Sequence, residues 1–501
     1  MSISAIGYLI IVIFAAILLV VAYGIHKRNA LSNVDELLTA GRRVPFGFVA
    51  ASVFVAWVWT GTIMAASEAG VWYGVGGGFN YGWGAIVPFL VFIPVALRLR
   101  KIMPRTTTFI EFVRERYGEV LANVFFVFGV VLVLYVCVMQ AVGIAYAFEY
   151  AFNINYKLIA IISSLLFASF IAIAGLRGSI YNSLFQFFII MLVVFITVPF
   201  IIKEIGIENI YNGLHNAATN PDNPNYNTEA LNLFGPSGLR YGLAAVVIAM
   251  GQVVLSQGYY STAAAATSSR NLFWAYLVGT ILAWLPVPII FGNVVGGSVF
   301  ALNVSPEDLE VATGAAPYIF NYFLGTYGSI VFVILIFMAG LTTGGNGLAG
   351  IQAMFTIDFY KRYINRLASE KQQAQFGKRI TLLFGLTIGI GALLLDGVSL
   401  LKIDIFSGIL FAAPTASLII GLWLPRLNTK VAFASMVIGL AAGLTAYFTI
   451  NDNELNWFVG NILALGLPFL IILIAIPFTK ERYNFNKLKD YRPDHQVEKI
   501  S

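Results

Sequence analysis

Three clusters of uncharged, oxygen-bearing residues interrupt long apolar segments of this sequence. They are Thr60-Gly61-Thr62, Gln252 with Ser256 and Gln257, and Thr342-Thr343 within a glycine-rich run. Hydroxyl, amide and backbone carbonyl oxygens can bind a hard cation without adding a charge to the site. In an apolar environment such groups are costly unless they have partners. Each cluster therefore indicates either hydrogen bonding and small-residue packing between helices or a binding site for an ion or a polar solute.

The segments around these clusters are typical of membrane helices. The chain has 501 residues, of which 59% are hydrophobic and only 11% are charged, whereas soluble domains carry about 25% charged residues. Residues 5–24 contain no charge, and about 20 apolar residues are enough for a helix to cross a bilayer. The apolar runs are continuous rather than alternating, which favours helices over a β-barrel.

We predict about thirteen spans and a single transmembrane domain over residues 1–501, with a cytoplasmic tail at 479–501. The predicted spans are 5–24, 46–72, 77–98, 119–150, 157–174, 178–202, 238–263, 272–300, 317–357, 379–397, 403–424, 430–450 and 457–478. An odd number of spans places the two termini on opposite sides of the membrane.

The distribution of charge predicts which side is which. Of 30 Lys and Arg residues, all but Lys157, Lys203, Arg240 and Lys402 fall on one side, and the opposite loops carry acidic residues such as Glu208. Under the positive-inside rule this predicts an extracellular N-terminus and a cytoplasmic C-terminus in the plasma membrane.

Two of the predicted spans contain helix-breaking sequences near mid-membrane. Residues 46–72 carry the Thr60 cluster between Trp57-Val58-Trp59 and Glu68, and residues 238–263 carry Gln252, Ser256 and Gln257. Interrupted spans at corresponding positions of two halves are typical of secondary transporters, because the freed carbonyls can bind Na⁺. The halves are 46–202 and 238–424. Each holds five helices, an odd number, so the second half is inverted relative to the first.

Other function classes have little support in the sequence. The phosphate-loop motif of ATP-driven pumps is absent, and all three histidines lie outside the predicted spans. No nucleophile–base or metal-ligand set is recognisable within the spans, so we expect no enzyme activity. Among the charged residues inside spans, Glu68 is a candidate site residue. Asp396, Lys402 and Asp404 cluster near one outer helix end, where they could extend to the membrane surface.

Several short motifs resemble those of the sodium:solute symporter family along nearly the whole chain. They are Ala40-Gly41-Arg42, Thr108-Phe109-Ile110-Glu111 with Arg116-Tyr117-Gly118, Gly175-Leu176-Arg177 with Gln186, and Phe355-Thr356-Ile357-Asp358-Phe359-Tyr360. Trp57 to Thr62 with Tyr73-Gly74-Val75, Gln257-Gly258-Tyr259-Tyr260 and Phe337-Met338-Ala339 are similar to the urea and polyamine symporters of that family.

The resemblance implies an all-α, leucine-transporter-like fold with an inverted five-plus-five helix repeat, one extra N-terminal helix and two extra C-terminal helices. It also implies a sodium site between the first and eighth core helices. The residues that match this site are Val55, Val58, Ala339, Thr342 and Thr343. The expected substrate residues beside the helix breaks are Trp59, Thr60, Glu68, Asn80, Gln252, Ser256 and Gln257.

These observations predict a Na⁺-coupled symporter that imports a small polar solute, such as urea, a urea-like solute or a polyamine, by alternating access. One alternative is proton coupling with Glu68 as the titrating group. Another is a transporter-like membrane sensor. We expect Na⁺ as coupling ion, no organic cofactor, a small-molecule substrate and the lipid bilayer as partners, no nucleic acid, and no obligate protein partner.

Overall fold

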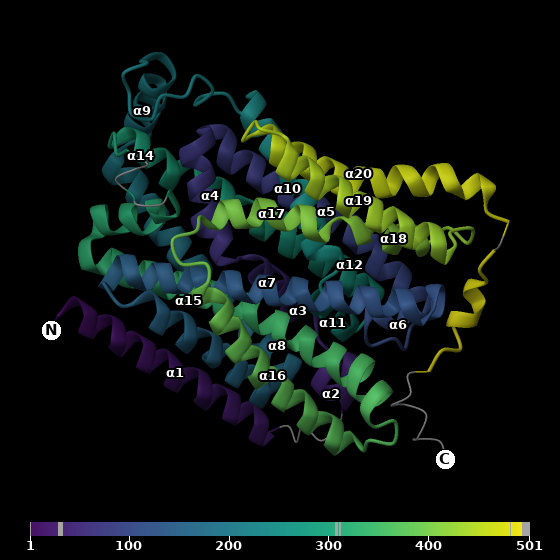
Figure 1. Ribbon diagram of the computed structural model, residues 1–501. Helices are drawn as coiled ribbons and strands as arrows, with labels where there is room; N and C mark the ends of the chain where they lie inside the picture. Colours follow the sequence, from purple (N-terminus) through teal and green to yellow (C-terminus); the bar gives the residue numbers. More distant parts are fainter. Residues whose placement is uncertain (1, 29–33, 306–308, 310–311, 481, 493–501) are drawn as a thin grey trace.

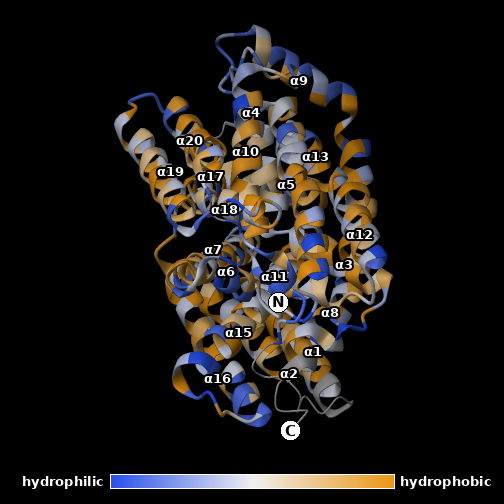
Figure 2. Cartoon of the chain, turned by 90° about the vertical axis from the view of Figure 1, so that its right-hand side faces the viewer, coloured by the Kyte–Doolittle hydropathy of each residue, from blue (hydrophilic) through white to orange (hydrophobic). Residues whose placement is uncertain are grey.

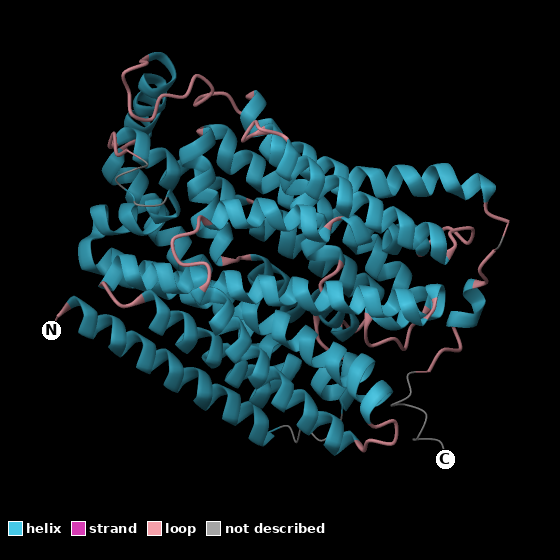
Figure 3. Cartoon of the chain, in the orientation of Figure 1, coloured by secondary structure: helices cyan, strands magenta, loops and turns pink. Residues whose placement is uncertain are grey.

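A computed structural model describes residues 2–28, 34–305, 309, 312–480 and 482–492, so the end of the tail, 493–501, lies outside it. The described residues form helices and loops (Figures 1 and 3), apart from one isolated bridge between Val44 and Ala266. The principal helices are α1 (Ile3–Arg28), α2 (Val34–Thr39), α3 (Phe46–Trp57), α4 (Thr60–Tyr73), α5 (Val75–Ile102), α6 (Phe109–Tyr117), α7 (Glu119–Phe152), α8 (Tyr156–Ile205), α9 (Ile207–Thr219), α10 (Pro236–Val254), α11 (Gln257–Ala265), α12 (Ser269–Leu277), α13 (Pro286–Ile290), α14 (Gly297–Ala301), α15 (Ala315–Met354), α16 (Glu370–Leu393), α17 (Leu400–Phe411), α18 (Ala413–Gly421), α19 (Thr429–Thr449) and α20 (Leu455–Ala475).

The long helices lie side by side in a bundle whose outer surface is apolar. Among the described residues, ten helices are long and apolar enough to cross a membrane, or up to twelve if each of two bent pairs is one span. Large side chains on this surface are exposed, for example Val20 (71%), Phe195 (68%) and Leu282 (69%). Hydrophilic residues gather mainly in loops and at helix ends (Figure 2). Such an apolar surface fits a lipid environment.

The predicted count of thirteen depends on α8, which is 50 residues long. At a rise of about 1.5 Å per residue this helix would measure about 75 Å, more than twice the hydrocarbon core of a bilayer. Gly175 interrupts it with φ 60° and ψ −169°, a left-handed conformation that suits glycine. If each bent pair counts as one span and α8 counts as two, the total equals the predicted number. The span count itself stays a prediction.

The first and the last long helix support the prediction that the chain termini lie on opposite sides of the membrane. In Figure 1, α1 begins at the left end of the bundle and α20 ends at the right. We refer to the left end, which also carries α9, as the predicted outer face, and to the right end, which carries α2 and α6, as the predicted inner face. Which of them faces the cytoplasm is a prediction from the charge distribution.

Both predicted helix breaks are present. The first span bends by 48° between α3 and α4, at Val58 and Trp59, and the second is interrupted between α10 and α11, at Leu255 and Ser256. A third break, a 50° bend between α17 and α18, was missed by the sequence analysis. Pro414, at the start of α18, is the signal for it, because proline has no N–H to continue the helix.

Glycines bring the first broken span close to its neighbours. α4 packs against the π-helical segment η3 (Phe291–Gly296), and a Cβ atom added to Gly70 would lie 2.1 Å from the carbonyl oxygen of Gly292. That contact is with backbone, which cannot rotate away. The helix that carries Glu68 is therefore fixed in position by a backbone-to-backbone approach.

We expect Gly70→Ala to lower stability by about 1–3 kcal/mol, the usual range for overpacking a tight interface. The measurement is the thermal unfolding midpoint of the detergent-solubilised protein. Gly466→Ala is the matched control, because its Cβ would meet no atom within 4 Å. Equal midpoints for both variants would contradict this view of the α4 interface.

Candidate functional site

The first helix break and α15 meet at the hydroxyl of Thr343. Its Oγ1 lies 3.2 Å from the carbonyl oxygen of Ala56 and 3.5 Å from that of Val55. These carbonyls belong to the last turn of α3, where the helix ends and its carbonyls lose their usual partners. Thr343 and Val55 are both buried. The structure thus brings together three neutral oxygens from two helices. Val55 supplies one of the two predicted carbonyls, and Ala56, rather than the predicted Val58, supplies the other.

The remaining predicted sodium residues surround this point. Thr342 is buried on α15 and its hydroxyl contacts the amide oxygen of Gln186 on α8, in addition to the carbonyl of Met338 (2.9 Å). Val58 lies in the break and Ala339 one turn before Thr343, both fully buried. The hydroxyl doublet therefore faces the protein interior rather than lipid. Its role in binding an ion stays a prediction.

A small cavity of about 20 Å³ lies beside the same break. Aromatic rings form much of its wall, and three other polar side chains, Thr62, Gln252 and Asp404, reach it from α4, α10 and α17. The full lining is Trp57, Trp59, Thr62, Tyr81, Ala85, Tyr241, Ala245, Ile248, Ala249, Gln252 and Asp404. Two of the predicted substrate residues, Trp59 and Gln252, are among them.

Gln252 is held by a network of polar groups. Its Nε2 donates to Asp404 Oδ1 (2.7 Å) and to Ser407 Oγ (3.1 Å), and Tyr135 Oη donates to the same carboxylate oxygen of Asp404 (2.8 Å). Three helices, α7, α10 and α17, are thereby joined next to the cavity. Asp404 is thus an interior group, and it does not reach the membrane surface as one reading of the sequence allowed.

Thr60 and Asn80 lie at other interfaces. The hydroxyl of Thr60 contacts Met139 O (3.2 Å), and its N–H donates to Gln140 Oε1 (3.0 Å), so Thr60 joins α4 to α7. The amide of Asn80 donates to Leu233 O (2.9 Å) in the segment before α10. Neither residue lines the cavity described above.

Glu68 is a buried carboxylate near the predicted outer face. It accepts hydrogen bonds from Ser399 Oγ (2.5 Å) and Thr313 Oγ1 (2.6 Å), and longer ones from Trp72 Nε1 and the N–H of Leu401 (3.4 Å each). Trp72 lies on α4 itself, whereas Ser399 and Leu401 belong to the start of α17 and Thr313 to the turn before α15. Glu68 thus ties α4 to both elements, and it lines a cavity of about 510 Å³.

Gln257 and Ser256 lie on the other side of the second break. Gln257 Oε1 accepts from the N–H of Phe109 (3.0 Å) and its Nε2 donates to Thr107 O (2.9 Å). The amide therefore attaches α11 to the segment before α6. Ser256 is buried in the break itself. Neither side chain lines the small cavity, and their substrate roles stay predictions.

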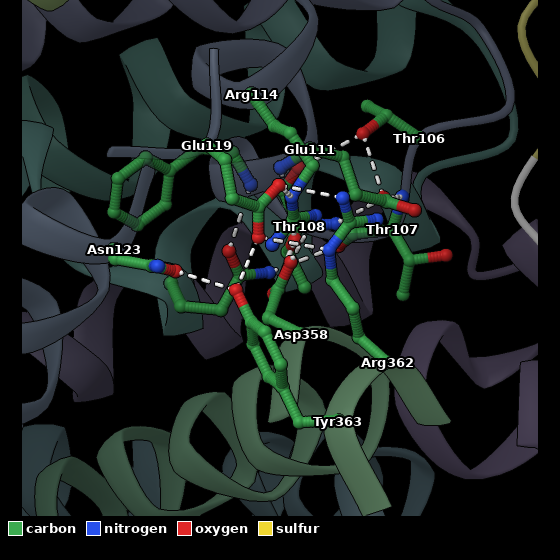
Figure 4. Close-up of polar contacts among 12 residues, drawn as sticks. Thr106, Thr107, Thr108, Glu111, Arg114, Glu119, Asn123, Asp358, Arg362 and Tyr363 are labelled. Atoms are coloured by element: carbon green, nitrogen blue, oxygen red, sulfur yellow. Dashed lines mark hydrogen bonds and ion pairs between the residues drawn. The ribbon is translucent and has the colours of Figure 1, made fainter. Parts of the chain in front are cut away.

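A polar cluster lies around α6 at the predicted inner face (Figure 4). Asp358 is fully buried, accepts from Thr108 Oγ1 (2.7 Å) and pairs with Arg114 (3.0 Å). Arg114 and Arg362 also pair with Glu119, at 3.2 and 2.5 Å. The cluster joins α6 and α7 to η6 (Phe355–Ile364), the π-helical continuation of α15.

Asp404, Trp57 and Gln186 were not among the predicted site residues. Gln186 was visible only as part of a motif, and Trp57 only as a neighbour of the break. Asp404 carried a usable signal, because a carboxylate within a membrane span is costly and almost always faces the protein interior.

The fold and these contacts define a class: a multi-pass membrane transporter whose interrupted helices surround a central cavity. The sequence profile of the sodium:solute symporter family matches residues 37–439. This chain belongs to the sodium:solute symporter family, and its members are transporters of small solutes rather than enzymes.

Similar proteins support that assignment. The chain is 26% identical over 95% of its length to a protein named "Probable urea active transporter 1" from Schizosaccharomyces pombe, covering 76% of that protein. It is 26% identical over 82% of its length to "Urea-proton symporter DUR3" from Oryza sativa subsp. japonica, covering 60% of it. The fold is similar to that of a Na⁺-coupled sialic acid symporter, with a TM-score of 0.75, 18% identity, and coverage of 96% of this chain and 98% of that chain.

We expect Asp358→Asn to open the inner face. Breaking a buried ion pair by neutralising one partner costs about 3–5 kcal/mol, so the segment before α6 should detach more often. The measurement is the rate of maleimide labelling of Thr107→Cys, a buried position, in a Cys137→Ser background. A rise of at least about tenfold is expected, since each 1.4 kcal/mol corresponds to a factor of ten.

Asp490→Asn is the control for this experiment, because Asp490 is exposed. Labelling of Thr107→Cys at the same rate in both variants would show that the Asp358 pair does not hold the inner face closed.

Proposed function

We propose that this protein is a Na⁺-coupled symporter that imports urea or a urea-like solute by alternating access. The observation that carries the proposal is the approach of Thr343 Oγ1 to the carbonyl oxygens of Val55 and Ala56 (3.5 and 3.2 Å) at a helix break. Ca²⁺, a hard cation of similar size to Na⁺, is bound by oxygens at about 2.4 Å, so two ligands at a right angle are about 3.4 Å apart. The spacing fits a shared ion.

The coupling follows from the origin of these oxygens. Val55 belongs to α3 and Thr343 to α15, so a movement of one helix against the other removes ligands from the ion. The affinity for Na⁺ then differs between conformations, which is the requirement for an ion to drive a conformational equilibrium. A membrane potential of 100 mV adds about 2.3 kcal/mol per charge moved inward.

Urea is favoured as the substrate class by the relatives named urea transporters and by the cavity. Its wall combines aromatic rings with one amide and one carboxylate. Such walls suit a small planar solute with several N–H groups.

The test is uptake of labelled urea into proteoliposomes, with and without an inward Na⁺ gradient, alongside putrescine, proline and a sugar. We expect Na⁺ to stimulate urea uptake. Thr343→Ala should raise the Na⁺ concentration for half-maximal uptake at least about tenfold, equivalent to about 1.4 kcal/mol. Thr387→Ala, an exposed threonine on α16 that bonds within its own helix, should behave as wild type. Urea uptake that is equal in Na⁺ and choline would overturn the sodium proposal, and binding without transport would favour a sensor.

Proton coupling is the second candidate, and Glu68 is the observation that favours it. Its carboxylate is buried, has hydroxyl and N–H partners, and makes no ion pair among the described residues. A relative is also named a urea-proton symporter.

We expect Glu68→Gln to retain more than half of Na⁺-driven urea uptake, because the amide oxygen can still accept from Ser399 or Thr313. The measurement compares uptake driven by a Na⁺ gradient with uptake driven by an acid-outside pH gradient in Na⁺-free vesicles. Wild-type uptake that follows only the pH gradient, and is abolished by Glu68→Gln, would replace the sodium proposal with the proton one.

A further inference from the structure

Asp404 is placed where a solute in the central cavity would meet it. It lies in the first half of α17, lines the cavity with Gln252, and is reached by side chains from α7 and α10. An ionised carboxylate in a membrane interior requires several hydrogen-bond donors to offset its lost hydration. The question is therefore how many donors the protein supplies.

The two oxygens of this carboxylate differ. Oδ1 accepts from Tyr135 Oη (2.8 Å) and from Gln252 Nε2 (2.7 Å). Among the residues that the structure describes, no donor reaches Oδ2. Asp404 is also half-buried rather than fully buried, and it lines the cavity. One oxygen thus orients the group, and the other is left to accept from a cavity occupant.

Trp57 supplies the complementary half of a recognition site. Its ring lines the same cavity and is 4% exposed, and its Nε1 has no hydrogen-bond partner among the described residues. The neighbouring indoles are satisfied: Trp59 Nε1 donates to Ala56 O (3.0 Å) and Trp284 Nε1 to Trp57 O (2.6 Å). A buried donor without a partner costs about 1–3 kcal/mol, which a ligand with an acceptor oxygen would recover.

We propose that Asp404 and Trp57 determine specificity for a neutral, planar solute that carries both N–H donors and a carbonyl acceptor. Asp404 Oδ2 accepts from the solute N–H groups, and Trp57 Nε1 donates to its carbonyl oxygen. This inference rests on the proposed function and names its substrate chemistry. Polyamines lack the carbonyl acceptor that Trp57 Nε1 requires.

The site should strongly reject solutes that lack either the N–H donors or the carbonyl acceptor. A site that hydrogen-bonds a substrate rejects analogues lacking the group by up to about 10⁴–10⁵, because its buried polar groups are then left unpaired. Tetramethylurea, which has no N–H, and guanidinium, which has no acceptor, test the two residues separately.

The experiment measures urea uptake kinetics and competition in proteoliposomes. Asp404→Asn should raise the KM for urea at least tenfold with the maximal rate within threefold, and leave the Na⁺ concentration for half-maximal uptake unchanged. Asp396→Asn, an exposed aspartate in the turn before α17, is the matched control and should resemble wild type. In wild type, tetramethylurea and putrescine should compete at least 100-fold more weakly than urea.

Trp57→Phe keeps the ring and removes the N–H, so it provides a second test if Asp404→Asn does not fold. In this variant, unlabelled urea should inhibit the uptake of labelled urea at least fivefold more weakly than in wild type. Inhibition by guanidinium should be unchanged. A urea KM within twofold of wild type in Asp404→Asn, or putrescine competing better than urea, would overturn this inference. Absence of Na⁺-driven urea uptake in wild type would instead overturn the proposed function.

Discussion

The organisation of this protein depends on one constraint: backbone groups freed by a helix break inside a membrane must find partners within the protein. At the first break, Ala56 O accepts from Trp59 Nε1, from Tyr259 Oη (3.1 Å) and from Thr343 Oγ1. Trp57 O accepts from Thr62 Oγ1 (2.8 Å) and Trp284 Nε1. The partners come from α4, α11, α15 and the segment before α13, so the break is the point at which these elements are fixed relative to each other.

The same constraint connects the two helix breaks to contacts near both faces of the bundle. Glu68 attaches α4 to α17 and to the turn before α15, while Gln257 attaches α11 to the segment before α6. Both are polar groups on the half-helix that follows a break. In the proposed transport cycle, a movement of either half-helix would break these bonds and shift the oxygens near Thr343. The breaks can therefore link the cavity to both faces without any additional element.

The sequence predicted the fold class, the two broken spans and the hydroxyl doublet, because each has a local cause. Polar residues and glycine in mid-membrane are visible in the sequence, and the doublet follows helical spacing. It did not predict which polar residue meets which partner. Thr60, Asn80 and Gln257 bond to α7, to the segment before α10 and to the segment before α6, since the rotation of each half-helix is set by tertiary packing such as the approach of Gly70 to Gly292.

The motifs that carry the family resemblance also proved informative about a different region. Thr108, Glu111 and Asp358 come from two of these motifs, and the structure unites them in the polar cluster of the predicted inner face. A hydrogen-bonded, buried cluster of this kind tolerates few substitutions, because removal of one partner leaves a charge unpaired. Trp57, Trp59 and Thr62 are the motif residues that line the cavity, whereas Asp404 belongs to no motif and was overlooked.

The separation of the two polar sites determines how much charge the proposed transport cycle moves across the membrane. The oxygens near Thr343 are neutral, so an ion bound there keeps its full charge and carries it through the membrane field. The carboxylate of Asp404 belongs to α17 and is fixed by Tyr135 and Gln252. In the proposed specificity site it contacts the solute and stays with the protein. With a neutral solute, one charge then moves per Na⁺, and a potential of 100 mV alone contributes about 2.3 kcal/mol, a concentration ratio of about 50. A cationic solute would add its own charge to the charge moved in each cycle. The number of charges moved per solute molecule therefore distinguishes urea from a polyamine, whatever their affinities.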